Sequence, residues 1–103
     1  MIRNVVVGRV RPGTPHEDVE RALRAMREFR MEGVSFRLAA GADAGLRDGN
    51  ASYAITVDLA DEAAYRAYDA DAEHNRIRRE LFAPIAEHIE RVQFRLPDDA
   101  AAG

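Results

Sequence analysis

His74 is the side chain whose chemistry stands out in this sequence, because it shares an apolar helical stripe with Ile77, Leu81 and Ile85. A neutral imidazole, with an ordinary pKa of about 6.5, can take a proton from an activated carbon acid. A partly buried histidine can equally be structural, with its ring satisfied by a backbone carbonyl. His74 is therefore a candidate general base, and the structural alternative stays open.

Asn4 is a second polar residue at an unusual position. It lies in a predicted strand, where asparagine is depleted, and a buried amide needs hydrogen-bond partners. Asn4 and His74 both emerge from otherwise apolar faces, so we expect Asn4 to face a polar cavity beside His74. The walls of this predicted small-molecule pocket are expected to include Val6, Gly8, Leu23, Met26, Ile77 and Leu81.

Other candidate sites are excluded or interpreted as surface. His16 and His88 have polar neighbours and are interpreted as solvated. No two histidines have the spacing of metal ligands, and the absence of cysteine excludes disulfide scaffolds, thiolate metal sites and cysteine nucleophiles. The glycines at 41–49 lack the lysine and the spacing of a phosphate-binding loop. We therefore predict no metal and no cofactor.

The net charge of the chain indicates no macromolecular partner. Fifteen basic residues against 18 acidic residues give a net charge of -3, so neither nucleic acid nor an anionic membrane is an expected partner. A basic run at Arg76, Arg78 and Arg79 is flanked by Glu73 and Glu80, and is interpreted as a solvated helix face rather than an anion site. Because no apolar run reaches the length of a signal sequence or a membrane span, we predict a cytoplasmic protein.

The elements that must position these residues follow from periodicity. Strands are predicted at 2–11, 34–40, 52–59 and 89–96, from apolar alternation or short apolar runs. Thr14 and Pro15 form the predicted N-cap and first position of a helix that ends before Gly33. Shorter helical segments are predicted from Asp61 to Tyr68 and along the His74 stripe. The order βαββαβ predicts an α+β, ferredoxin-like fold with a four-stranded antiparallel sheet and its helices on one face.

The face of the sheet away from the helices is predicted to carry apolar residues, among them Val5 and Val7. Such a face usually marks an association surface. Two sheets packed face to face give the simplest closed arrangement, so we predict a homodimer. Residues 97–103 are acidic and rich in alanine, and are predicted to be a flexible tail.

Two stretches resemble the stress-responsive A/B barrel (Dabb) family. One runs from Met1 through the Arg9 to Thr14 segment, and the other from Tyr53 to His74, with Asp61-Glu62-Ala63-Ala64 leading into Ala67-Tyr68. The resemblance covers residues 2–96 and implies a dimeric α/β barrel domain. In plant olivetolic acid cyclase and its relatives it further implies aldol cyclisation of a linear polyketide, with His74 matching the general base and Tyr68 the tyrosine that assists it. The family commonly has a second histidine where this chain has Asn4, and an amide does not titrate.

Two hypotheses follow. The first is a cofactor-independent cyclase or lyase acting on a polyketide or related β-keto or aromatic small molecule, with His74 as base, Tyr68 as its hydrogen-bonding partner and Asn4 polarising a carbonyl. The second is a non-catalytic, stress-associated dimer that binds a small ligand, since many members of the family have no established activity. Tyr68 can also be a core aromatic with its hydroxyl at the surface. A monooxygenase using Asn, Trp and His is disfavoured, because the chain has no tryptophan.

Overall fold

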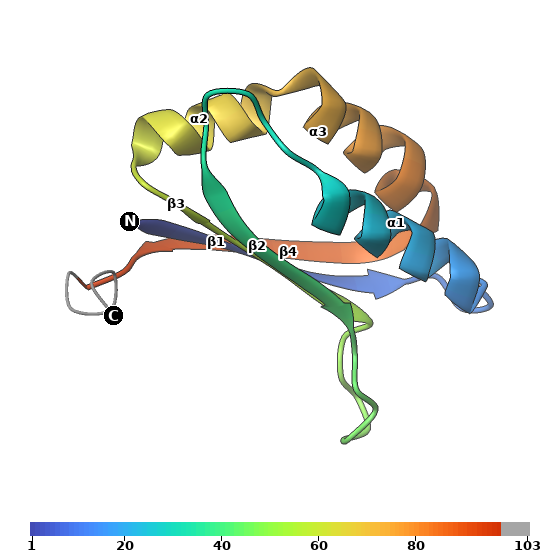
Figure 1. The fold of residues 1–103 in the computed structure, drawn as a ribbon. Coiled ribbons are helices and arrows are strands. Elements are labelled where there is room, and N and C mark those ends of the chain that lie inside the picture. Colours follow the sequence, from blue (N-terminus) through green and yellow to red (C-terminus); the bar gives the residue numbers. More distant parts are fainter. Residues whose placement is uncertain (98–103) are drawn as a thin grey trace.

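The sheet consists of four strands whose alternation places apolar side chains on one face. They are β1 (Ile2–Val10), β2 (Phe36–Ala42), β3 (Tyr53–Leu59) and β4 (Ala86–Arg95). In the computed structural model, which describes residues 1–97, the strand order is β2-β3-β1-β4 and each neighbouring pair is antiparallel (Figure 1). The predicted ferredoxin-like α+β fold is confirmed.

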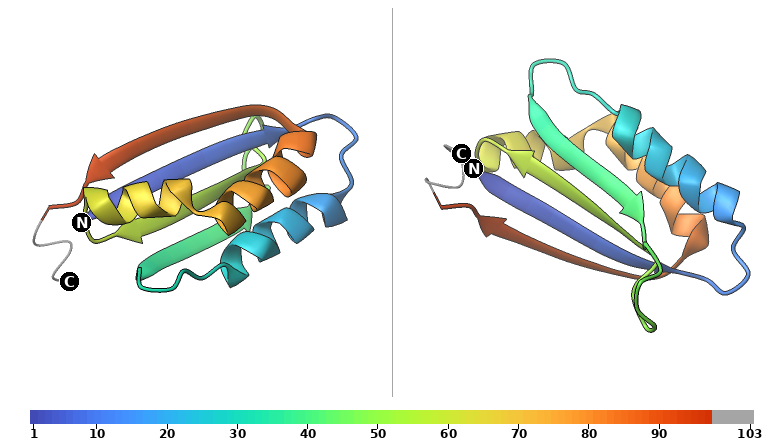
Figure 2. Two further views of the ribbon diagram at one scale, coloured as in Figure 1. Left: turned by 90° about the horizontal axis from the view of Figure 1, so that it is seen from above. Right: turned by 60° about the horizontal axis from the view of Figure 1, so that its bottom comes forward.

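All helices cover the same face of the sheet, as the two views in Figure 2 show. Helix α1 (His16–Glu28) joins β1 to β2, while α2 (Glu62–Ala70) and α3 (Ala72–Ile77) join β3 to β4. The β2–β3 connection projects to the side away from the helices (Figure 1). No helix in the described part of the chain is long and apolar enough to cross a membrane. Of the predicted tail, only Pro97 lies within the described residues.

The core lies between α1 and the sheet. The inward residues of β3 alternate as predicted and are all buried, and the apolar stripe of α1 packs on them. The buried residues of these two elements are Tyr53, Ile55, Val57 and Leu59 on the strand and Val19, Ala22, Leu23 and Met26 on the helix.

The start of α1 differs from the prediction. The helix begins at His16, with Pro15 rather than Thr14 at the N-cap position and no side-chain cap. Instead of accepting a hydrogen bond from the first turn, the Thr14 hydroxyl donates to the Arg11 carbonyl oxygen at 2.6 Å. This bond closes the turn after β1, so the hydroxyl is already used there.

Two aspartates define the helices around the candidate site. Asp61 caps α2 as predicted, its side chain accepting a hydrogen bond from the Ala64 amide at 2.8 Å. Asp71 has an extended backbone, ends α2 and caps α3, accepting from the His74 amide at 3.0 Å. The break between α2 and α3 therefore fixes the backbone at His74.

After α3 the chain forms a π-helical turn at Arg78–Phe82 and a short 3₁₀ turn at Ala83–Ile85. The predicted apolar stripe is found only in part: Leu81 and Ile85 pack against the core but stay partly exposed, while the wider turn also buries Phe82, which was not predicted. Pro84 explains the change, since it has no amide to continue the α-helical pattern. The Ala83 amide bonds to the Arg78 carbonyl, five residues back.

Candidate functional site

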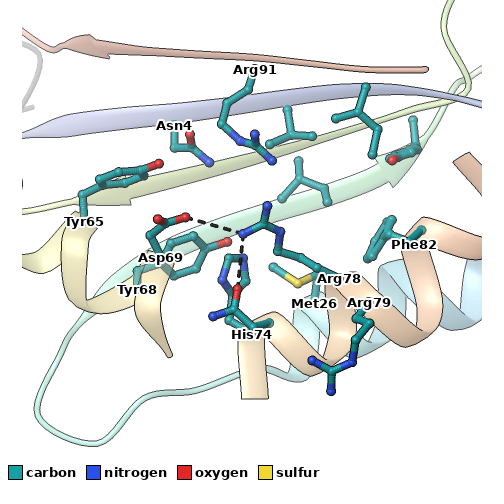
Figure 3. A pocket seen from close by; sticks show the side chains of 16 residues that line it. Asn4, Met26, Tyr65, Tyr68, Asp69, His74, Arg78, Arg79, Phe82 and Arg91 are labelled. Atoms are coloured by element: carbon teal, nitrogen blue, oxygen red, sulfur yellow. Dashed lines mark hydrogen bonds and ion pairs between the residues drawn. The ribbon is translucent and has the colours of Figure 1, made fainter. Parts of the chain in front are cut away.

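A cavity of about 400 Å³ lies between the helix-covered face of the sheet and the segment from α2 to the π-helical turn (Figure 3). Its volume is near the lower end of the range for ligand pockets, about 300 to 1,000 Å³. The apolar part of its lining consists mainly of Val6, Met26, Tyr53, Ile55, Phe82 and Ile89. The polar part includes Asn4, Tyr68, Asp69, His74, Arg78 and Arg91.

Tyr68 and His74 lie side by side in the cavity wall. Their ring centroids are 4.1 Å apart, with 35° between the ring planes, and Phe29 packs near both rings. Only 2% of Tyr68 and 6% of His74 is exposed. The spacing of six residues brings the two rings together because α2 ends at Asp71 and α3 restarts the helix in a new direction.

The imidazole of His74 is in a setting that keeps it neutral. Burial lowers the pKa of His74, and the positive charge of Arg78 acts in the same direction. Its Nδ1 atom is buried and has no hydrogen-bond partner among residues 1–97. Burial raises the pKa of Tyr68, so its hydroxyl stays protonated and can donate a hydrogen bond. The pair thus offers a proton acceptor beside a proton donor.

Asn4 faces the same cavity from β1. Its side-chain oxygen accepts a hydrogen bond from Gln93 Nε2 at 2.8 Å, and its amide nitrogen points into the cavity (Figure 3). Gln93 is directly opposite Asn4 in the β1–β4 register and is also 3.3 Å from the Tyr65 hydroxyl. Because Gln93 occupies the acceptor, Asn4 presents a donor to a ligand.

The predicted polar residues therefore come together, whereas the predicted apolar wall needs correction. Val6 and Met26 line the cavity, but Gly8, Leu23, Ile77 and Leu81 do not. A Cβ at Gly8 would lie 2.2 Å from the Tyr53 ring, so the aromatic ring occupies that space. Leu23 and Ile77 are buried in the core, and the π-helical turn puts Phe82 at the cavity in place of Leu81.

Four charged residues that line the cavity, Asp69, Arg78, Arg79 and Arg91, were not predicted to do so from the sequence. The basic run divides: Arg76 and Arg79 are exposed beside Glu80, as expected of a solvated face, but Arg78 turns toward the cavity. Arg78 Nη1 lies 3.5 Å from Asp69 Oδ1 and donates to Asn75 Oδ1 at 3.3 Å. Arg91 reaches the cavity from β4, where it pairs with Val6. Within the described ranges, no group of three His, Asp or Glu side chains is close enough to hold a metal ion.

The lowered pKa of His74 predicts a pH dependence of stability. The unfolded chain binds a proton near the ordinary pKa of about 6.5, while the folded chain stays neutral to lower pH. The free energy of unfolding is therefore highest, as far as His74 is concerned, above about pH 6.5. It falls by at most about 1.4 kcal/mol per pH unit as the pH drops from that value toward the pKa of His74 in the folded chain. Urea unfolding between about pH 7.5 and 5.5 should show this slope in the wild type and a smaller one in His74→Gln. Equal slopes in both proteins would contradict it.

Comparison with known proteins supports the fold but not a family. No protein-family model matches the chain, and no curated protein matches its sequence. A dimeric ferredoxin-like protein of unknown function from Thermobifida fusca is 29% identical, with a TM-score of 0.83 over 92% of this chain and 90% of that chain. A Dabb-family protein with a ferredoxin-like fold from Mesorhizobium loti is 18% identical, with a TM-score of 0.74 over 93% of this chain and 96% of that chain.

An enzyme is also among the similar structures. The hydroxynitrile lyase from Passiflora edulis is 14% identical, with a TM-score of 0.75 over 94% of each chain. At the identities of the lyase and the Mesorhizobium protein, the likeness shows the fold alone. Structures of this kind thus include proteins of unknown function and at least one enzyme.

Proposed function

We propose that this protein is a cofactor-independent enzyme that removes a proton from carbon in a small carbonyl compound, as an aldol-type cyclase or a lyase does. Its substrate is a polyketide or a related β-keto or aromatic molecule. The observation that carries the proposal is the pairing of His74 with Tyr68, rings 4.1 Å apart, in the wall of a cavity that Asn4 also faces. A base, a hydroxyl donor and an amide donor around one apolar space are the groups that enolate chemistry requires.

The proposed reaction divides the work among these three side chains. His74 takes a proton from the carbon next to a carbonyl, and the electron pair of the broken C–H bond moves onto the carbonyl oxygen. The Asn4 amide and the Tyr68 hydroxyl donate hydrogen bonds to that oxygen. In a cyclisation, the enolate carbon then attacks a second carbonyl of the same molecule, and the proton held by His74 neutralises the new alkoxide. His74 thus takes one proton and returns one proton, and the reaction consumes no oxidant or reductant.

The proposal is tested by a reaction that needs only the first step. Deuterium uptake at the central carbon of 1-phenylbutane-1,3-dione, followed by NMR in deuterium oxide, measures proton removal whatever the natural substrate. We expect the wild-type protein to accelerate uptake above the buffer rate, in proportion to protein concentration. If the compound binds and uptake stays at the buffer rate, the catalytic proposal is wrong.

A second candidate is a non-catalytic dimer that binds a small ligand in the same cavity. One observation favours it: His74 Nδ1 has no hydrogen-bond partner within the described part of the chain. In a histidine that acts as a general base, a carboxylate or carbonyl usually accepts a hydrogen bond from the second ring nitrogen and so orients the imidazole. Binding without deuterium uptake is the result this candidate predicts.

We also infer that the protein is a homodimer, joined through the sheet face away from the helices, and a member of the stress-responsive A/B barrel family. On that face Val5 lies opposite Val92 and Arg3 opposite Phe94 in the β1–β4 register. Val92 is 55% exposed and Phe94 45% exposed in the single chain, which is unusual for large apolar side chains on adjacent positions of one face. The similar Thermobifida fusca protein is described as dimeric. Light scattering should give about twice the chain mass of 11.5 kDa, and a folded monomer would refute the inference.

A further inference from the structure

The charges around the cavity are unbalanced. The charged residues of its lining are Asp69, Arg78, Arg79 and Arg91. Arg79 pairs with Glu80 and its guanidinium turns away from the cavity (Figure 3), so Arg78 and Arg91 supply two positive charges there and Asp69 one negative charge. Asp69 pairs with Arg78. Arg91 has no carboxylate within 4.0 Å among the ion pairs formed by residues 1–97. The cavity therefore has one net positive charge, which a bound monoanion would neutralise.

The two guanidinium groups come from opposite walls and point at the same space. Arg78 belongs to the π-helical turn and Arg91 to β4, and Figure 3 shows their side chains extending toward one another. The charges of both arginines act on the same two groups, Tyr68 and His74. Two like charges facing each other repel, and a ligand anion between them removes that repulsion. Such an arrangement suits the planar, two-oxygen geometry of a carboxylate.

We propose that Arg78 and Arg91 form a carboxylate clamp, which makes the ligand of this cavity a small monocarboxylate. The apolar part of that ligand lies against Met26 and Phe82, and its carbonyl is within the reach of Tyr68 and Asn4. The clamp deepens the proposed function and rests on it in one respect, since both take this cavity as the ligand site. It specifies the substrate as a keto acid rather than a neutral ketone.

Arg79 provides a matched control. It is the next residue to Arg78 and borders the same cavity, but its guanidinium turns away from the clamp (Figure 3) and lies 3.6 Å from Glu80 Oε2. Removal of the Arg79 charge changes the net charge of the protein as much as removal of Arg78 or Arg91. A difference between these variants therefore reports the position of the charge.

The experiment measures binding of 4-oxo-4-phenylbutanoate and of its neutral amide by titration calorimetry. We expect the wild type to bind the carboxylate about 10 to 100 times more tightly than the amide, as charge-assisted hydrogen bonds predict. Arg91→Gln and Arg78→Gln should each weaken carboxylate binding much more than amide binding and so remove most of that preference, and Arg79→Gln should keep it. Because Arg78 also pairs with Asp69, the exposed Arg91 gives the variant that is safest for folding.

Three results would overturn the clamp: equal binding of carboxylate and amide by the wild type, an equal loss in Arg79→Gln, or tighter binding of the more highly charged phosphonate analogue. The outcome is separable from that of the proposed function. A carboxylate preference without deuterium uptake leaves the clamp and refutes catalysis. Uptake into the neutral diketone without a carboxylate preference leaves catalysis and refutes the clamp.

Discussion

His74→Ala is expected to lower the rate of deuterium uptake into 1-phenylbutane-1,3-dione by about a hundredfold or more, the usual contribution of a general base. The reason is positional: within the cavity lining, His74 is the neutral group able to accept a proton near pH 7, because burial and Arg78 lower its pKa. Burial has the opposite consequence for Tyr68, whose raised pKa keeps it a donor. Tyr68→Phe should therefore cost less than His74→Ala, since it removes one hydrogen bond and keeps the ring.

The control for this prediction is His16→Ala. His16 is exposed in the first turn of α1, so the substitution removes an imidazole without touching the cavity. His74→Gln keeps a neutral side chain of similar size, so it controls for a loss of activity that is caused by misfolding. Uptake by His74→Ala or His74→Gln at the wild-type rate, in folded protein, would show that another group removes the proton.

The parts of the site that could be predicted are those determined by local periodicity. Alternation along β1 puts Asn4 and Val6 on the helix-covered face, and alternation along β3 buries Tyr53 and Ile55. Asp61 identified the start of α2 through its capping chemistry. Along both strands the pattern repeats over several residues, so one exceptional residue does not change the assignment.

The residues that could not be predicted depend on irregular geometry or on strand register. The wider π-helical turn places Phe82 at the cavity instead of Leu81, whereas Arg78 lies one ordinary α-helical turn after His74 and so shares its side of the helix. Periodicity assumes a constant turn, so it misses such a shift, although Pro84 was a signal that the helix would be disturbed. Arg91 and Gln93 become visible only when β4 is placed beside β1 with Val6 opposite Arg91.

Alternation in β1 also divides two roles between the two faces of one strand. Asn4 and Val6 face the cavity, while Val5 and Val7 face the open side of the sheet. A substitution on one face therefore leaves the other face nearly unchanged, because neighbouring side chains of a strand point in opposite directions. Binding and association can accordingly be tested independently in this protein.

Val92→Asp is expected to raise the dissociation constant of the homodimer by at least about a hundredfold, because it places an unpaired charge in an apolar interface. In a two-fold arrangement the change occurs in both subunits, so two carboxylates are desolvated together. Val92 is 55% exposed in the single chain, and the folded subunit should tolerate the aspartate. Light scattering at micromolar concentration should then report a mass near that of one chain.

Ala63→Asp provides the matched control, since it adds the same charge at an exposed position early in α2, where an acidic residue is favourable. It should leave the dimer intact. If the subunit cannot stay folded alone, Val92→Asp will instead melt at a lower temperature than the wild type and Ala63→Asp at the same protein concentration, which also indicates weakened association. A dimer of unchanged affinity in Val92→Asp would mean that this sheet face is not the interface, and association would have to use another surface of the chain.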